Sequence, residues 1–227
     1  MTAIANVSTH DGDIDLTAGI ATLGLTLSAG QREQLEAYLA LLAKWNKTYN
    51  LTAIREPRRM VTHHLLDALA VVPHLPRTAG LRMLDVGSGG GVPGIPLAIA
   101  RPDMHVVMID SNQKKAAFLM QAAIELRLPN VESHAVRVED YVPHAPFDIV
   151  ISRAFSDLAA FATVAAGQLA ANGKMFAMKG VHPDEELALL PPEFVVVATP
   201  ALKVPGLDAS RHLIIMQRKQ ALTGQPQ

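Results

Sequence analysis

The sequence predicts an α/β protein built on a seven-stranded, doubly wound sheet that is preceded by a helical segment. Three observations support this fold class. From Leu81 onward, short apolar runs rich in Val and Ile alternate with helical patterns, as in repeated βαβ units. A glycine-rich turn, residues 87–94, follows the first of these runs and opens a helix. The chain has 227 residues, 49% of them hydrophobic, which is enough to bury a large core.

The first third of the chain is predicted to be helical. Residues 1–27 show no sustained period and are interpreted as a flexible terminus or a short helix. Ser28 is expected to cap a helix that runs to about Lys47, because apolar residues then recur at three- and four-residue spacing. A second helical pattern covers residues 57–72 and ends before two prolines.

The remainder forms the sheet domain, residues 80–219, after a helical segment at 28–79 and before a tail at 220–227. The expected strands are residues 81–86, 104–109, 131–136, 147–151, 174–178, 194–197 and 212–216. The expected helices between them are residues 93–100, 113–126, 158–171 and 184–190. Because these strands are continuously apolar, we expect a sheet that is covered on both faces.

The composition excludes several classes of function. No cysteine is present, so a disulfide framework, a thiolate metal site and a cysteine nucleophile are all ruled out. No run of about 18 apolar residues occurs, and residues 1–15 carry acids where a signal peptide would be basic. We therefore expect a cytoplasmic protein with neither a membrane nor a metal partner.

The formal net charge of -1 conceals an uneven distribution. Residues 44–82 hold seven basic and two acidic side chains, Arg58 and Arg59 among them, and residues 201–219 hold four basic and one acidic. An acidic sheet domain lies between these two segments. If the basic segments fold onto one face, they would form an electrostatic footprint for RNA.

The glycine-rich turn indicates a nucleotide-like cofactor, because glycine lets the backbone approach a ligand closely and the next helix offers free N–H groups. A dinucleotide fingerprint that starts at Gly87 would need glycine in place of Val92. One that starts at Gly89 puts Pro93, which lacks an N–H, into the phosphate-binding turn. The GxGxG pattern of S-adenosylmethionine enzymes, residues 87–91, fits better.

Two carboxylates flank this turn. Asp85 ends the first strand, where it would repel a pyrophosphate but could pair with a methionine ammonium. Asp110 ends the second strand, where it could accept hydrogen bonds from both ribose hydroxyls. The structural alternative is a plain strand-to-helix turn in which Asp110 only caps the next helix.

The possible methyl acceptors are also limited by the sequence. Attack by carbon 5 of a pyrimidine normally uses a cysteine, which is absent. Exocyclic amino methylation uses an Asn/Asp-Pro-Pro-Tyr/Phe turn after the fourth strand, where this chain has Ile-Ser-Arg-Ala-Phe at 151–155. A ring nitrogen with a free lone pair, such as nitrogen 7 of guanine, needs positioning more than a base. No catalytic residue is therefore assigned.

Three further polar residues follow strands at the edge where α/β proteins bind ligands. Arg153 and Lys179 could each hold a phosphate or form a surface ion pair. Glu139 could accept from an adenine amino group or remain a solvated acid at a helix start.

Taken together, the motifs closely resemble the ribosomal RNA small subunit methyltransferase G family, also called glucose-inhibited division protein B. The resemblance runs from about Trp45 to Met216. Its motifs are Asn50-Leu-Thr52, His64 with Asp67, residues 85–96, Asp110-Ser111, Ser152-Arg-Ala-Phe155, Met178-Lys-Gly180 and Arg211-His212.

The resemblance implies a class I, Rossmann-like S-adenosylmethionine-dependent methyltransferase that modifies nitrogen 7 of guanine 527 in 16S ribosomal RNA. Its partner would be that RNA or the small ribosomal subunit, and a monomer is expected. With the residues argued above, the expected cofactor contacts are Asp85, Gly87, Gly89, Val92, Asp110, Ser111, Asn112, Val138, Glu139 and Arg153. The expected RNA contacts are Arg58, Arg59, Arg153, Lys179, Arg211 and His212.

Two other classes of function stay open at this point. A non-catalytic nucleotide-binding or ribosome-associated module would keep the sheet and the cofactor without turnover. An NAD-dependent oxidoreductase would bind its dinucleotide at the same turn.

Overall fold

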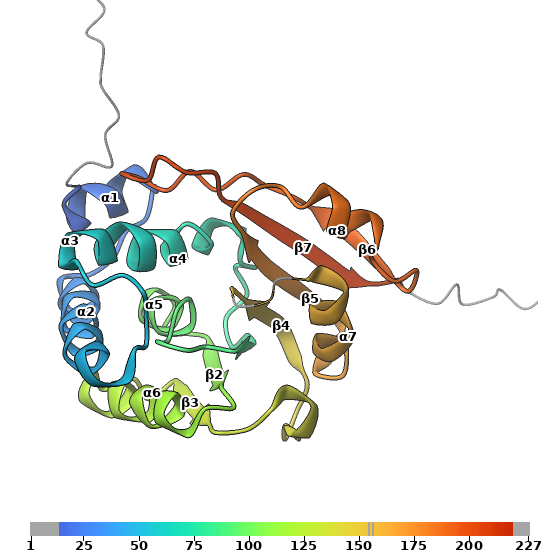
Figure 1. Ribbon diagram of the computed structural model, residues 1–227, viewed down its shortest axis with the longest axis horizontal. Helices are drawn as coiled ribbons and strands as arrows, with labels where there is room; N and C mark the ends of the chain where they lie inside the picture. The colour runs from blue at the N-terminus through green and yellow to red at the C-terminus, as the bar shows by residue number, and fades with distance from the viewer. Residues whose placement is uncertain (1–13, 154, 156, 220–227) are drawn as a thin grey trace, which may run out of the picture.

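The computed structural model describes residues 14–153, 155 and 157–219 (Figure 1). The predicted tail at 220–227 and the first part of the predicted terminal segment lie outside the described residues. The strands are β1 (Arg82–Val86), β2 (His105–Ile109), β3 (Val131–His134), β4 (Phe147–Ser152), β5 (Leu169–Lys179), β6 (Phe194–Ala198) and β7 (His212–Arg218). The α-helices are α1 (Leu16–Thr22), α2 (Ala29–Tyr49), α3 (Pro57–Met60), α4 (Asp67–Leu69), α5 (Gly94–Ala100), α6 (Gln113–Glu125), α7 (Leu158–Ala166) and α8 (Asp184–Ala188).

The seven strands form one mixed sheet in the order β3-β2-β1-β4-β5-β7-β6. Strands β1 to β5 run parallel, whereas β7 pairs antiparallel with both β5 and β6. Because β7 is reversed, its first residue, His212, lies opposite Lys179, the last residue of β5. The residues that precede β7 therefore reach the same edge as those that follow the parallel strands. This arrangement confirms the predicted fold class.

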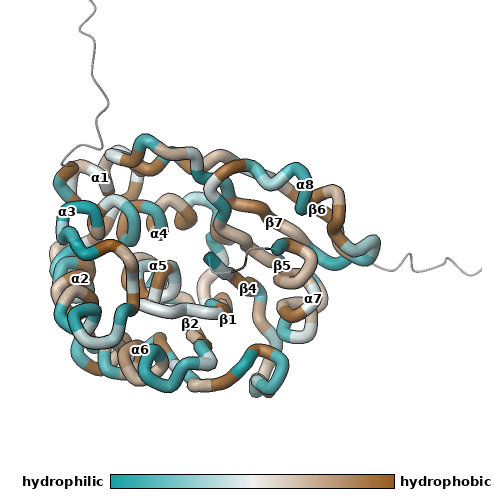
Figure 2. Tube along the Cα trace, viewed as in Figure 1, coloured by the Kyte–Doolittle hydropathy of each residue, from teal (hydrophilic) through white to brown (hydrophobic). Residues whose placement is uncertain are grey.

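Alternate strand residues pack into two apolar cores, one on each face of the sheet. Met83 and Met108 belong to the core that contains residues of α2, α5 and α6, whereas Leu84 and Val107 belong to the core beneath α7. Figure 2 shows tan and brown segments along the strands and a largely teal α8. Burial on both faces explains why the strand sequences are continuously apolar.

Helix α2 packs the N-terminal segment against the sheet domain. It begins with the predicted cap, in which Ser28 and Gln31 exchange side-chain and backbone hydrogen bonds. The side-chain nitrogen of Gln31, Nε2, also donates to the carbonyl oxygen of Ile99 near the end of α5, at 2.7 Å. Among the described residues, no helix is long and apolar enough to cross a membrane.

The predicted second helix is present but is not regular. A π-helical turn, Val61–Leu66, separates α3 from α4, and a 3-10 turn, Val72–His74, follows. π-helical turns are frequent at functional sites. This one carries His63 and His64 and leads directly into Asp67.

The predicted helix at 158–171 was too long. Helix α7 ends at Ala166, and β5 begins at Leu169, which pairs with Phe147 of β4. The backbone N–H of Phe147 donates to the carbonyl oxygen of Gln168 at 2.9 Å. Pairing with a neighbouring strand therefore overrides the helical preference of the alanines.

Candidate functional site

The glycine-rich turn has backbone conformations that glycine adopts readily. The φ angles of Gly87, Gly89 and Gly91 are 71°, 57° and 87°, all in the left-handed region. At the start of α5, the backbone N–H of Gly94 donates to Asp85 Oδ2 at 2.9 Å. A Cβ at position 94 would lie 2.7 Å from the same oxygen. The glycine here allows the helix to approach the buried carboxyl group.

Asp85 lies beneath the turn and is 1% exposed. Its Oδ1 has no hydrogen-bond partner among the described residues. Burial raises the pKa of the Asp85 carboxyl group to about 7, although hydrogen bonds from Gly94 and Ser88 and the charge of Arg153 act in the opposite direction. A buried acceptor without a partner suits a donor that a ligand supplies.

Asp110 is held at the end of β2 by backbone groups on both sides. Its Oδ2 accepts from the N–H of Gly89 and its Oδ1 from the N–H of Asn112, both at 2.9 Å. The cap of α6 is Asn112, whose side chain accepts from the first helical turn. Helix capping therefore does not account for Asp110, and Ser111 and Asn112 are exposed beside it.

Val138 and Glu139 lie in a 3-10 turn, Val138–Asp140, that follows β3. Val138 is buried, and its carbonyl oxygen accepts from Gln168 Nε2 at 3.0 Å. Glu139 is exposed. The backbone here is thus fixed, while the carboxylate of Glu139 remains accessible to a ligand.

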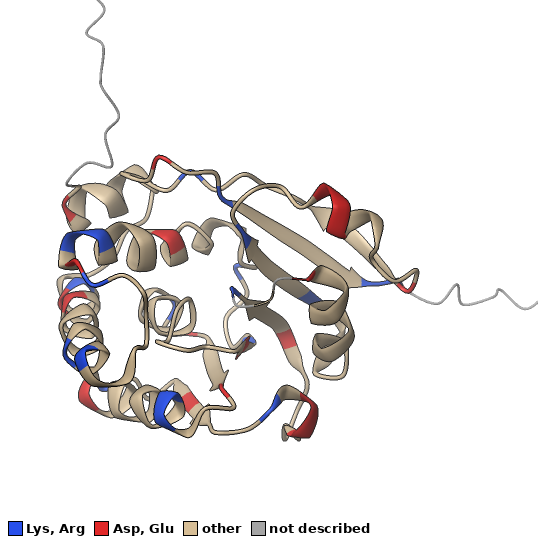
Figure 3. Cartoon of the chain, in the orientation of Figure 1, with Lys and Arg blue, Asp and Glu red and all other residues tan. Residues whose placement is uncertain are grey.

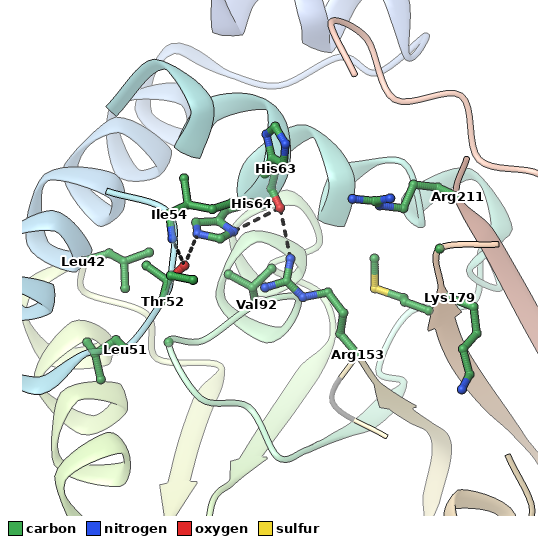
Figure 4. A pocket seen from close by; sticks show the side chains of 14 residues that line it. Leu42, Leu51, Thr52, Ile54, His63, His64, Val92, Arg153, Lys179 and Arg211 are labelled. Carbon is green, nitrogen blue, oxygen red and sulfur yellow. Dashed lines mark hydrogen bonds between the residues drawn. The ribbon is translucent and has the colours of Figure 1, made fainter. Parts of the chain in front are cut away.

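A cleft of about 530 Å³ opens beside the turn, between the N-terminal segment and the carboxyl edge of the parallel strands (Figure 4). It brings together the predicted residues Val92, Arg153, Lys179 and Arg211. The full lining consists of Leu42, residues 51–54, His63, His64, Gly90, Val92, Arg153, residues 178–180 and Arg211. One wall is therefore largely apolar, and the opposite wall carries the basic groups.

His64 is a buried, neutral member of this lining. Its Nδ1 lies 3.0 Å from the carbonyl oxygen of His63, which can only accept, so Nδ1 carries the proton. Nε2 then accepts from Thr52 Oγ1 at 2.9 Å. Burial, with the nearby charge of Arg153, lowers the pKa of His64 to about 4. His64 is thus fixed in one tautomer and has no nitrogen left to act as a base.

Asp67 joins the two basic side chains of the cleft. Its Oδ2 lies 3.3 Å from Arg153 Nη1, and its Oδ1 accepts from Arg211 Nε at 3.1 Å. Arg153 Nη1 also donates to the carbonyl oxygen of His63 at 3.0 Å. Figure 4 shows both guanidinium groups approaching the helix that carries His63 and His64.

The other predicted RNA contacts are more dispersed. Lys179 lines the cleft, but its ammonium points away from Arg153 in Figure 4 and lies 2.7 Å from Glu186 Oε2. His212 Nδ1 lies 3.0 Å from the carbonyl oxygen of Gly180. Arg58 and Arg59 are exposed on α3, which is largely blue in Figure 3. Lys179 is therefore paired within the protein.

Sequence reasoning did not assign roles to Asp67 or Tyr38. Asp67 contacts partners 86 and 144 residues away along the chain. Tyr38 donates its hydroxyl to the carbonyl oxygen of Gly90, 52 residues away. Asp67 stands in a motif of the resemblance, which marks the position without indicating its contacts, and no local spacing marks Tyr38.

Comparison with known proteins gives consistent matches. The sequence model of the family described as rRNA small subunit methyltransferase G matches residues 31–214. Proteins called Ribosomal RNA small subunit methyltransferase G are similar: that of Chromobacterium violaceum is 55% identical, over 89% of this chain and 96% of its own. That of Laribacter hongkongensis is 54% identical, over 88% and 95%.

One of the solved structures that share the fold covers most of this chain. It is described as a SAM-dependent methyltransferase from Geobacter sulfurreducens in complex with S-adenosyl-L-homocysteine. The TM-score is 0.51 at 15% sequence identity, and the match covers 79% of this chain and 98% of the other.

Proposed function

The chain belongs to the rRNA small subunit methyltransferase G family, and on that premise we propose that it methylates nitrogen 7 of a guanine in 16S ribosomal RNA. The methyl donor is S-adenosylmethionine, which supplies a methyl group on a positively charged sulfur. The partner is the RNA itself or the small ribosomal subunit that contains it.

The cofactor side of the site consists of the turn and the ends of β1 and β2. Asp110 is preorganised by Gly89 and Asn112, and each of its oxygens keeps a lone pair for a ribose hydroxyl. The orphaned Oδ1 of Asp85 suits the ammonium of the methionine part. The other proposed contacts are Gly87, Val92, Ser111, Val138, Glu139 and Arg153. These donor and acceptor types fit an adenosyl sulfonium better than a pyrophosphate.

His64, the buried histidine on the acceptor side of the site, is not available as a base. His64 is neutral, and both of its ring nitrogens are engaged within the protein. Nitrogen 7 of guanine has a free lone pair, so its methylation requires no proton removal. The chain therefore contributes alignment of the base and exclusion of water, which are the contributions expected of a preformed cleft.

The RNA side is proposed to use the basic residues around the cleft. Arg153 and Arg211 lie on its wall, and Arg58 and Arg59 extend the positive surface on α3. His212 and Lys179 stand at the same sheet edge, although Lys179 is paired with Glu186. These contacts would orient the strand while the cleft receives the base.

The observation that carries this proposal is the continuity of the cleft with the glycine turn, because Gly90 and Val92 line the cleft. The test is a methylation assay on small-subunit RNA from cells that lack the protein, offered both naked and within subunits. Borohydride and aniline cleavage, read by primer extension, should give a stop at guanine 527. Binding of S-adenosylmethionine without a modified guanine in either substrate would instead indicate a non-catalytic module.

A further inference from the structure

A buried carboxylate at the edge of the cleft holds two arginines at once. Asp67 is 2% exposed, and its two oxygens contact different side chains, Arg153 from the end of β4 and Arg211 from the start of β7. These arginines are 58 residues apart in the sequence. Arg153 follows β4, whereas Arg211 precedes β7. One aspartate therefore fixes the separation of two independent guanidinium groups.

In each arginine, only some of the guanidinium nitrogens donate hydrogen bonds to other residues of the protein. Arg153 contacts Asp67 and His63 through Nη1 alone, and Arg211 contacts Asp67 through Nε and Ser210 through Nη1. Among the described residues, Nε and Nη2 of Arg153 and Nη2 of Arg211 have no hydrogen-bond partner. The two side chains are 32% and 24% exposed. Both guanidinium groups thus keep donors for a ligand in the cleft.

The charge of this cluster matches a single anion. Two guanidinium groups and one carboxylate leave one net positive charge, and the neighbouring Lys179 is paired with Glu186. A phosphodiester carries one negative charge and presents two oxygens to a pair of donors. Guanidinium groups bind such oxygens well because they can use two N–H groups at fixed angles.

We propose that Asp67 is a positioning residue that holds Arg153 and Arg211 as a preformed site for one backbone phosphate of the RNA strand entering the cleft. The proposal rests on the proposed function for the identity of the strand. It goes beyond that function because it assigns the ligand of the two arginines and gives the buried carboxylate its role.

Replacing Asp67 by asparagine separates positioning from simple charge. The substitution removes a negative charge from an anion site, so charge alone would make RNA bind more tightly. Positioning requires the opposite result, because two unpaired guanidinium groups repel each other and lose their shared anchor. We expect Asp67→Asn to weaken binding of an unmodified 16S ribosomal RNA transcript about tenfold.

The dependence on salt identifies the ligand. Between about 50 and about 200 mM salt, each phosphate contact adds about 0.7 to the slope of log affinity against log salt for single-stranded RNA. Arg153→Ala and Asp67→Asn should each lower the slope by about that amount. Arg153→Lys and Arg211→Lys keep the charge but replace the planar guanidinium, whose nitrogens lie apart, by a single nitrogen, so they should also bind more weakly.

Asp103→Asn is the matched control, because it removes a carboxylate from another arginine pair, with Arg101 Nη2 at 2.7 Å, outside the cleft. It should leave both affinity and slope unchanged. The melting temperature checks that each variant is folded, and calorimetry with S-adenosylmethionine checks that the Asp67, Asp103 and Arg211 variants retain the cofactor site. If Asp67→Asn does not fold, the two lysine variants carry the test.

Several results would overturn the proposal. Tighter or equal binding by Asp67→Asn would remove the positioning role, as would full affinity in both lysine variants. Weaker binding by Arg153→Ala with an unchanged slope would mean contact with a base instead of a phosphate. A salt-independent wild type, tested with the transcript and with small subunits, would also contradict it. If methylation fails but the slopes change as expected, the proposed function falls and the anion site stands.

Discussion

Tyr38 of α2 donates its hydroxyl to the carbonyl oxygen of Gly90, in the middle of the glycine turn, at a distance of 2.5 Å. The ring of Tyr38 is completely buried. Leu42, one helical turn later, packs so closely that a Cβ on Gly90 would lie 3.1 Å from its Cδ1. The N-terminal segment is thus part of the support of the cofactor turn.

Tyr38→Phe should lower the free energy of unfolding by about 0.5–1.5 kcal/mol, because it removes the hydrogen bond to the partly buried carbonyl oxygen of Gly90. Urea denaturation measures this change. Tyr49→Phe is the control, since Tyr49 is 40% exposed at the end of the same helix. Equal stability of the two variants would show that the bond to Gly90 contributes little.

Gly94→Ala should destabilise the protein by about 1–3 kcal/mol, because the new methyl group would lie 2.7 Å from Asp85 Oδ2 and 2.8 Å from the sulfur of Met108. Gly30→Ala should do the reverse. Gly30 is exposed in α2 with nothing within 4 Å, and alanine there should stabilise the helix by about 0.5–1 kcal/mol. Melting temperatures that shift in the same direction would contradict this pair of predictions.

Asp85 and His64 should oppose each other in the dependence of stability on pH. The pKa of Asp85 is raised from 3.8 to about 7, so the folded state binds the extra proton and stability falls as the pH rises through that window. The pKa of His64 is lowered from 6.5 to about 4, so the unfolded state binds the extra proton and stability falls as the pH drops through that window. The two effects largely cancel in the wild type.

Single variants should reveal each effect. Relative to the wild type, Asp85→Asn should gain stability as the pH rises from about 4 to about 7, at up to about 1.4 kcal/mol per pH unit. His64→Gln should gain stability relative to the wild type as the pH falls from about 6.5 to about 4. Urea denaturation across this range measures both differences, and parallel curves for all three proteins would exclude these titrations.

Asp110→Asn should weaken binding of S-adenosylmethionine by roughly 10- to 150-fold, which corresponds to the loss of about 1.5–3 kcal/mol for hydrogen bonds to a charged group. The side-chain amide of asparagine has only one acceptor, its oxygen, because its nitrogen is a donor. It therefore cannot accept from Gly89, Asn112 and two ribose hydroxyls at the same time. Isothermal calorimetry measures the affinity. Unchanged binding would leave Asp110 with only its contacts to the turn.

Local features of the sequence predicted the parts of the site that lie close together in the chain. Asp85 lies near the end of β1, and the turn and Asp110 follow β1 and β2, whose ends share one sheet edge, so periodicity and spacing were sufficient to place them. Capping was also predictable at Ser28, because the cap depends on residues three positions apart.

Features that depend on distant pairing were not predictable. The alanines at 170 and 171 suggest a helix, but the backbone there belongs to β5 because Leu169 pairs with Phe147. For the lysine at the end of β5 the sequence left both a phosphate contact and an ion pair open, and the partner Glu186 lies on a separate helix, α8. The role of Asp67 depends on Arg153 and Arg211, which only the complete sheet brings together.

The reversed direction of β7 has a consequence for the order of events during synthesis. Arg211 stands immediately before this strand and 144 residues after Asp67. A nascent chain that has already made α4 and the whole parallel part of the sheet still lacks one of the two arginines that Asp67 holds. The cleft can therefore acquire its complete charge pattern only after β7 has been translated and has inserted between β5 and β6.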